Sequence, residues 1–160
     1  MAVTTYWYAN AFIQAFSAAV DWTGETKLGI MLTTSTYTPN QDTHDFQDDI
    51  TNEVATANGY TQLAATGTGK ILTTTTVTSA LNVVTFDTAD PQWTSSGAGF
   101  TARRCVIVYT ASGVLTTNPV ILWSDFGQDE TASGGGTFTY TVAATGWGTN
   151  TPADATGFPA

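Results

Sequence analysis

The densest group of chemically active side chains in this sequence is an acidic run around its single histidine. The run holds the carboxylates Asp42, Asp45, Asp48, Asp49 and Glu53, with His44 among them. Clustered carboxylates suit Ca²⁺, but the EF-hand loop needs oxygen donors at alternate positions, then a glycine and a distal glutamate. The run has neither this order nor the glycine. We therefore expect a solvated acidic surface loop, with no metal ion and no other cofactor.

Two further patterns match catalytic motifs only in part. His44 and Asp45 could be two members of a hydrolytic triad, but no serine lies in a Gly-X-Ser-X-Gly turn. The run Gly67 to Lys70 suggests a phosphate-binding loop, but Ala64 replaces the first glycine and Ile71 replaces the Ser or Thr. The chain has four Lys and Arg, one His and one Cys, which leaves few side chains for acid–base or nucleophilic catalysis. These residues predict a non-enzymatic protein.

Composition excludes several other classes of protein. Thirty-four of the 160 residues are threonine, which packs well on a pleated strand, and only 11% of the residues are charged. A net charge of −9 argues against nucleic-acid binding, which needs basic patches. Cys105 is the only cysteine, so no intrachain disulfide is possible. We expect neither a secretory leader nor a membrane partner, because no basic residue precedes Lys27 and polar residues interrupt the apolar stretch 6–20.

Helical periodicity occurs only near the N-terminus. One apolar stripe is formed by Ala9, Phe12, Ile13, Phe16 and Val20. This spacing predicts a short amphipathic helix over about residues 8–20. Such a helix either covers one face or end of a sheet or docks on a neighbouring subunit.

The rest of the chain is patterned as strands. Leu28, Ile30 and Leu32 alternate as in a half-buried strand. Further strands are predicted at residues 70–78, 82–88, 103–110, 120–125 and 137–143, with Gly, Asn and Pro turns between them. The pattern predicts a mainly β fold, an antiparallel β-sandwich or barrel-like domain over residues 1–145, followed by an extended C-terminal arm over residues 146–160.

Candidate contact residues lie in three places. Arg103 and Arg104 begin a strand that is apolar on both faces, so the strand should be central, with the two arginines pointing opposite ways as ion-pair partners. Large aromatics at the two ends are expected to anchor on a neighbour. With the acidic run, the predicted interface residues are Trp7, Tyr8, Asp42, Asp45, Asp48, Asp49, Arg103, Arg104, Trp147 and Phe158.

The other tryptophans leave two interpretations open. Trp22, Trp93 and Trp123, together with Trp147 as the expected contact residue, could form a stacking platform for sugar rings, as in a carbohydrate-binding module. Core packing is favoured, because Trp123 follows the apolar run Val120-Ile121-Leu122.

A series of short motifs runs through residues 8 to 142. It includes Asp48-Asp49-Ile50-Thr51-Asn52-Glu53-Val54, Asp90-Pro91-Gln92-Trp93, Val106-Ile107-Val108-Tyr109 and Asp125-Phe126-Gly127. As a whole the series resembles a group of small structural proteins of tailed-bacteriophage virions. Members of that group look like head-decoration, or cement, proteins, and some are minor tail proteins. The chain departs from the group at Trp7-Tyr8 and in the tail from Gly146 to Ala160.

The resemblance implies a non-enzymatic capsid decoration protein that binds the outer surface of the head and stabilises capsomer junctions. The implied partners are the major capsid protein and copies of the chain itself, as a homotrimer. The implied location is the virion, after synthesis in the host bacterial cytoplasm. The alternatives are a tail or head–tail connector structural protein, or a carbohydrate-binding β-sandwich module.

Overall fold

A computed structural model describes residues 3–17, 19–23, 27–80 and 83–150. The elements in these ranges are β1 (Thr4–Trp7), α1 (Ala9–Phe16), β2 (Leu28–Thr33), the 3₁₀ turn η1 (Gln47–Asp49), β3 (Lys70–Ile71), β4 (Thr76–Ala80), β5 (Val83–Asp87), β6 (Gln92–Thr94), β7 (Phe100–Tyr109), the 3₁₀ turn η2 (Leu115–Thr117), β8 (Val120–Ala132), β9 (Thr137–Thr139) and β10 (Gly148–Asn150). The prediction of a mainly β protein with one short N-terminal helix is confirmed.

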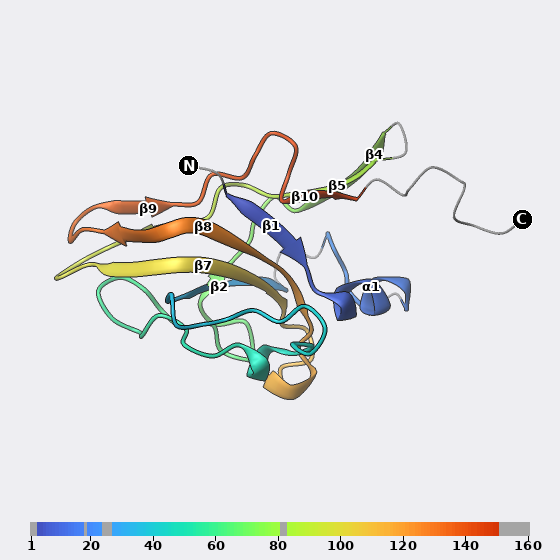
Figure 1. Cartoon of the computed structure of the whole chain (residues 1–160), viewed down its shortest axis with the longest axis horizontal. Helices are drawn as coiled ribbons and strands as arrows, with labels where there is room; N and C mark the ends of the chain where they lie inside the picture. The colour runs from blue at the N-terminus through green and yellow to red at the C-terminus, as the bar shows by residue number, and fades with distance from the viewer. Residues whose placement is uncertain (1–2, 18, 24–26, 81–82, 151–160) are drawn as a thin grey trace, which may run out of the picture.

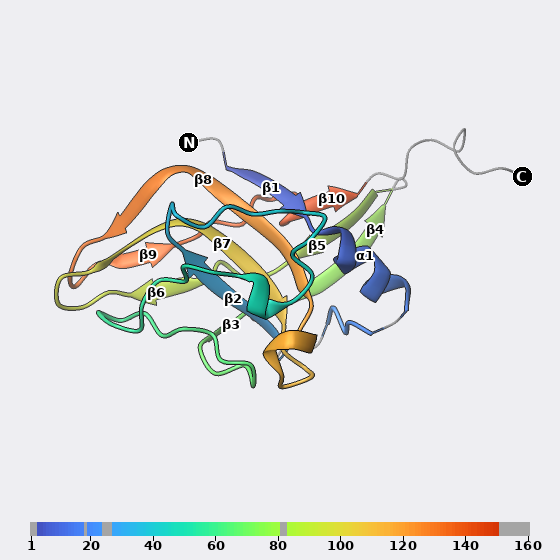
Figure 2. The ribbon, with the colours of Figure 1, turned by 60° about the horizontal axis from the view of Figure 1, so that its bottom comes forward.

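The strands form antiparallel sheets of unequal size (Figures 1 and 2). The largest has the order β1-β8-β7-β2-β3, and β7 pairs with β2 and β8 along most of its length. A second sheet has the order β10-β5-β4, and β6 pairs with β9 in a third. In the views of Figures 1 and 2, β10, β5 and β4 lie toward the same end as α1.

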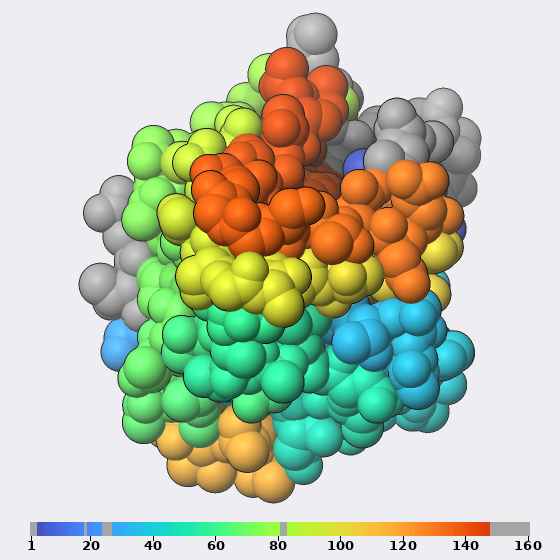
Figure 3. All heavy atoms as spheres, turned by 90° about the vertical axis from the view of Figure 1, so that its left-hand side faces the viewer, coloured from blue at the N-terminus to red at the C-terminus, as the bar shows by residue number. Residues whose placement is uncertain are grey.

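Strand β7 is buried on both faces, as the sequence predicted. Cys105 and Ile107 enter one hydrophobic cluster, hereafter the first cluster, which includes side chains of the two smaller sheets. Val106 and Val108 enter the second cluster. The second cluster is closed by the connection between β2 and β3, residues 34–69, in which η1 is the one regular helix or strand. Figure 3 shows the surface of this connection, coloured cyan to green, beside the yellow surface around the start of β7.

The covering connection also changes the burial of β2. All six residues of this strand are buried, so the predicted alternation of buried and exposed positions is wrong. Leu28, Ile30 and Leu32 face the first cluster, and Met31 faces the second. Gly29 fits beside Leu63, whose methyl carbons would lie 2.6 Å from an added Cβ atom.

Two predicted strand boundaries also differ from the structure. The predicted strand 70–78 is divided into β3 and β4, because Thr74 adopts a φ of 54°, which no extended strand allows. Strand β8 continues past its predicted end at Asp125 to Ala132, with Gly127 at a φ of 80° within it. Strands β1, β6 and β10 were not predicted from the sequence.

The predicted C-terminal arm begins too early. Trp147 is only 2% exposed and stacks on Tyr140 with 4.6 Å between ring centroids. Its indole Nε1–H donates to Thr88 Oγ1 at 2.8 Å, and β10 pairs with β5. The folded domain therefore extends through Asn150, and the boundary at residue 145 is wrong. Phe158 lies outside the described residues.

The N-terminus also belongs to the domain. Strand β1 pairs with β8 along its whole length, and Tyr8 is fully buried. Trp7 is half-buried and packs against Phe12 and Trp22. The prediction that Trp7 and Tyr8 anchor on a neighbour is therefore wrong for Tyr8, and Trp7 makes its aromatic contacts within its own chain.

Helix α1 is attached through an unexpected face. The buried residues of the helix are Asn10 and Ala11, and Asn10 Nδ2–H donates to the carbonyl of Asp45 at 3.0 Å. The predicted apolar stripe instead points outward at Ile13, which is 64% exposed, and at Phe16, which is 88% exposed. The helix lies at the end of the large sheet, and its stripe meets that sheet through Phe12, which packs on Trp7 of β1, while Ile13 and Phe16 stay outside the contact.

The position of Trp147 makes a testable prediction. Trp147→Ala should lower the free energy of unfolding by about 3–5 kcal/mol, because it leaves a cavity beside Tyr140 and removes the bond to Thr88. Val114→Ala, at a residue that is 52% exposed, should change it by less than about 0.5 kcal/mol. Urea denaturation of both variants measures the difference. Equal stabilities would contradict the placement of Trp147 in the core.

Candidate functional site

The acidic run lies in the connection that covers the second cluster, and its carboxylates have different roles. Asp42 and Asp48 are exposed, and Asp45 is half-buried. Asp49 turns inward, where its Oδ2 accepts the backbone N–H groups of Asp45 at 2.9 Å and Phe46 at 3.0 Å. The expected surface loop is present, but Asp49 is one of its structural supports.

His44 joins the acidic loop to the buried end of β1. The Tyr37 hydroxyl lies 2.8 Å from His44 Nδ1 and 2.8 Å from the Tyr8 hydroxyl. Burial raises the pKa of Tyr8 far above its ordinary value and that of Tyr37 to about 12, so both hydroxyls stay protonated at neutral pH. The three side chains fix the loop over the sheet.

Further side-chain hydrogen bonds hold the rest of the connection. Gln47 Nε2–H donates to the Leu63 carbonyl at 2.7 Å, and Asn118 Nδ2–H donates to Gln47 Oε1 at 2.8 Å. Glu53 Oε1 accepts the Tyr60 hydroxyl at 2.7 Å and the Leu63 N–H at 2.9 Å. Burial raises the pKa of Glu53 despite these two hydrogen bonds. Residues 34–69 therefore have a defined shape with few strand hydrogen bonds.

The two adjacent arginines converge on one carboxylate. Arg103 Nε lies 2.7 Å from Asp125 Oδ1, and Arg104 Nε lies 2.9 Å from Oδ2. The prediction that they point opposite ways is wrong, because the register of β7 against β8 shifts between Ala102 and Arg104. The expectation that they pair with a carboxylate is confirmed, within the chain itself.

Arg104 also attaches the covering connection to β7 through a hydrogen bond. Arg104 Nη1–H donates to the carbonyl of Tyr37 at 2.7 Å. The side chains of Arg103, Arg104 and Asp125 are 26%, 16% and 19% exposed. All three side chains are therefore partly exposed and bound to one another, and a contact of Arg103 and Arg104 with a neighbour stays a prediction.

The environment of Asp125 shifts its ionisation. Partial burial raises the pKa of its carboxyl, but the Gly127 N–H and the two guanidinium groups outweigh burial and hold the pKa below its ordinary value. Sequence reasoning missed Asp125 as the partner of the arginines. Its place in the Asp125-Phe126-Gly127 motif was the available signal, since the Asp125 carboxylate also accepts the Gly127 N–H at 2.7 Å.

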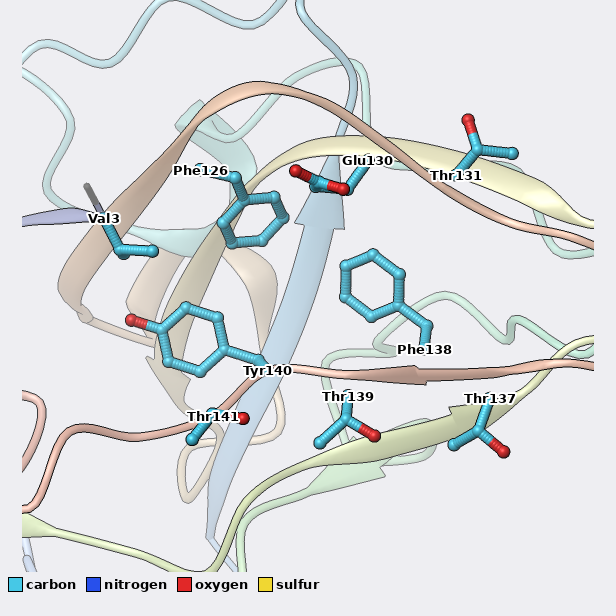
Figure 4. A pocket seen from close by; sticks show the side chains of 9 residues that line it. All are labelled: Val3, Phe126, Glu130, Thr131, Thr137, Phe138, Thr139, Tyr140 and Thr141. Atoms are coloured by element: carbon cyan, nitrogen blue, oxygen red, sulfur yellow. The ribbon is translucent and has the colours of Figure 1, made fainter. Parts of the chain in front are cut away.

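An open cleft of about 540 Å³ lies between β8 and β9 (Figure 4). It is lined by Val3, Phe126, Glu130, Thr131, Thr137, Phe138, Thr139, Tyr140 and Thr141. Phe126 packs against Phe138 and Tyr140, with ring centroids 5.9 and 5.7 Å apart. Hydroxyl groups and one carboxylate beside aromatic rings could hydrogen-bond a polyol. Among the described residues, none of the predicted contact residues lines this cleft, although Trp147 stacks on its wall residue Tyr140.

The tryptophans proposed as a sugar platform lie elsewhere. Trp93 is 4% exposed in the first cluster, which agrees with the favoured core interpretation. Trp22 and Trp123 are half-buried and pack against the first and second clusters respectively. None of these three residues lines the cleft of Figure 4.

The described part of the chain has neither a metal-binding cluster nor a membrane-spanning helix. Within residues 3–17, 19–23, 27–80 and 83–150, no three or more His, Cys, Asp or Glu side chains are grouped so that they could hold a metal ion. In the same part of the chain, no helix has both the length and the apolar character needed to cross a membrane.

Comparison with known proteins gave no match: no family model, no curated protein and no solved structure is significantly similar to this chain.

The inward turn of Asp49 makes a second prediction. Asp49→Ala should lower the free energy of unfolding by about 2 kcal/mol, because two backbone N–H groups lose a charged acceptor. Asp48→Ala removes the same charge from an exposed position and should cost less than about 0.5 kcal/mol. Chemical denaturation compares the two variants. If both lost the same stability, the support assigned to Asp49 would be disproved.

A third prediction follows from the lowered pKa of Asp125. Its carboxylate stabilises the folded state above its ordinary pKa of about 4, and this contribution is lost as the pH falls through the lower folded-state pKa. Asp125→Asn should cost about 2 kcal/mol at neutral pH, because two guanidinium groups lose their counter-ion. The difference in stability between wild type and variant should shrink below about pH 4. Thermal melts across this range measure it, and a difference independent of pH would contradict the assignment.

Proposed function

We propose that this chain is a non-enzymatic virion structural protein, a capsid decoration protein that binds the outer surface of the head. The proposal rests on the resemblance of residues 8 to 142 to phage structural proteins and on one structural observation. That observation is the connection of residues 34–69, an irregular surface held in one shape by buried side-chain hydrogen bonds.

A fixed irregular surface suits binding to a repeating protein lattice. Ordering a loop on binding costs conformational free energy, and a loop that is already ordered avoids this cost. The same connection exposes Asp42 and Asp48. We propose that these carboxylates face basic side chains of the major capsid protein, across a contact that stabilises the junction between capsomers.

Two parts of the proposal concern assembly and location. Copies of the chain associate with one another, as a homotrimer at local three-fold positions. A tail or head–tail connector protein is the alternative within the virion. The number of copies per purified virion, measured by quantitative mass spectrometry, separates the two, because a head surface holds many more copies than a tail.

The cleft of Figure 4 favours a second candidate function of another class. Four threonines and Glu130 surround a cleft of about 540 Å³, which is within the size range of small-molecule sites. A carbohydrate-binding β module would use these groups to hydrogen-bond sugar hydroxyls. Glycan-array binding that Glu130→Gln abolishes would favour this function over decoration.

The capsid proposal predicts a specific effect of two surface charges. Asp42→Asn combined with Asp48→Asn should weaken binding to capsids that lack the protein by about tenfold or more, because rim charges act on association and salt dependence. Asp129→Asn, also at an exposed carboxylate but on β8, should bind as wild type does. Cosedimentation with capsids at low and high salt measures binding. Unchanged binding by the double variant would contradict the role of the acidic loop.

A further inference from the structure

The end of the molecule that carries α1 has an exposed apolar surface. Ile13 and Phe16 on the helix are 64% and 88% exposed, and Val77 on β4 and Val84 on β5 are each 41% exposed. Figures 1 and 2 both show α1 toward the same end of the molecule as the β4–β5 hairpin. We call the surface formed by these four side chains the helix–hairpin patch.

A hollow lies within this patch. It has a volume of about 200 Å³, and its lining includes Phe12, Phe16, Trp22, Val84 and Phe86. Trp22 contacts Phe86 edge to face, with ring centroids 5.6 Å apart, so aromatic rings form part of its wall. Phe16 is therefore both a wall of the hollow and the most exposed large side chain beside it.

The charge of the chain indicates what can cover this patch. The chain has a net charge of −9, so two copies repel each other wherever their acidic surfaces meet. Every residue that lines the hollow is apolar and uncharged. Although Asp21 and Asp87 adjoin the lining residues Trp22 and Phe86, two copies meet less charge repulsion at this hollow than at the acidic loop, which is the better match for a basic partner.

The size of the patch sets the strength of such a contact. Phe16 alone would bury about 150–250 Å². The smaller, partly exposed Ile13, Val77 and Val84 bring the patch to on the order of 400 Å² per copy. Stable complexes bury about 800 Å² per partner, so this area supports a weak, reversible association. An exposed apolar side chain next to an apolar hollow can fill the same hollow on another copy.

We propose that the helix–hairpin patch is a self-association surface, in which Phe16 of one copy enters the hollow of a second copy of this chain. The inference deepens the proposed function by naming the contact between copies. It rests on that function only for its biological setting, and purified protein alone tests it, so its failure leaves capsid binding by the acidic loop unaffected.

Sedimentation equilibrium of the purified full chain from about 1 µM to about 1 mM tests the proposal. The average mass of the wild type should rise above 16.8 kDa as its concentration increases. Phe16→Ser should weaken this association by about tenfold or more, because buried aromatic residues dominate such contacts. Leu115→Ser is the matched control, since Leu115 is 44% exposed on η2, and it should associate as wild type does.

Far-UV circular dichroism and thermal melts establish that each variant is folded. Val77→Ser, on the other side of the patch, gives the same readout if Phe16→Ser does not fold. A wild type that stays monomeric over the whole concentration range would overturn the proposal. Association that both patch variants retain in full would overturn it as well, because the copies would then meet through another surface.

Discussion

Strand β7 has buried side chains on both faces, and this requires a cover on each side of the large sheet. The first cluster receives Phe86 and Phe138 from the smaller sheets. The second cluster receives Tyr37, Ile50 and Leu63 from the connection between β2 and β3. A strand of this kind is stable only while both covers stay in place, because exposing either face returns apolar surface to water.

The two covers are held by different interactions. The smaller sheets have strand hydrogen bonds, but the connection of residues 34–69 is mostly irregular and its buried polar groups need other partners. Asp49, Gln47 and Glu53 supply them by bonding backbone groups of the same connection. Asp49 and Glu53 of the acidic run therefore help to fix a surface on which Asp42 and Asp48 are exposed, which is why we propose a role for this surface and not for a pocket of reactive groups.

Periodicity predicted those features that depend on local sequence. The mainly β class and the central position of β7 both follow from apolar residues at consecutive positions of a strand. Periodicity did not predict that Arg103 and Arg104 share one partner, because the register shift that brings them together is set by the neighbouring strand β8. The burial of Trp147 was missed for a related reason, since its hydrogen-bond acceptor Thr88 and the strand that β10 pairs with, β5, lie about 60 residues earlier in the chain.

The orientation of α1 shows what an amphipathic pattern does and does not specify. The stripe of Phe12, Ile13 and Phe16 predicts a helix with one apolar face, but it does not say which surface that face meets. Here a polar contact, from Asn10 to the Asp45 carbonyl, attaches the other side of the helix, and the stripe remains exposed at Ile13 and Phe16. A weak contact through this stripe gains strength when many copies are held on one lattice, because a second contact then forms at high effective concentration. Under the proposed function, the acidic loop and the helix–hairpin patch would therefore reinforce each other on a capsid, the first by binding the shell and the second by joining neighbouring copies.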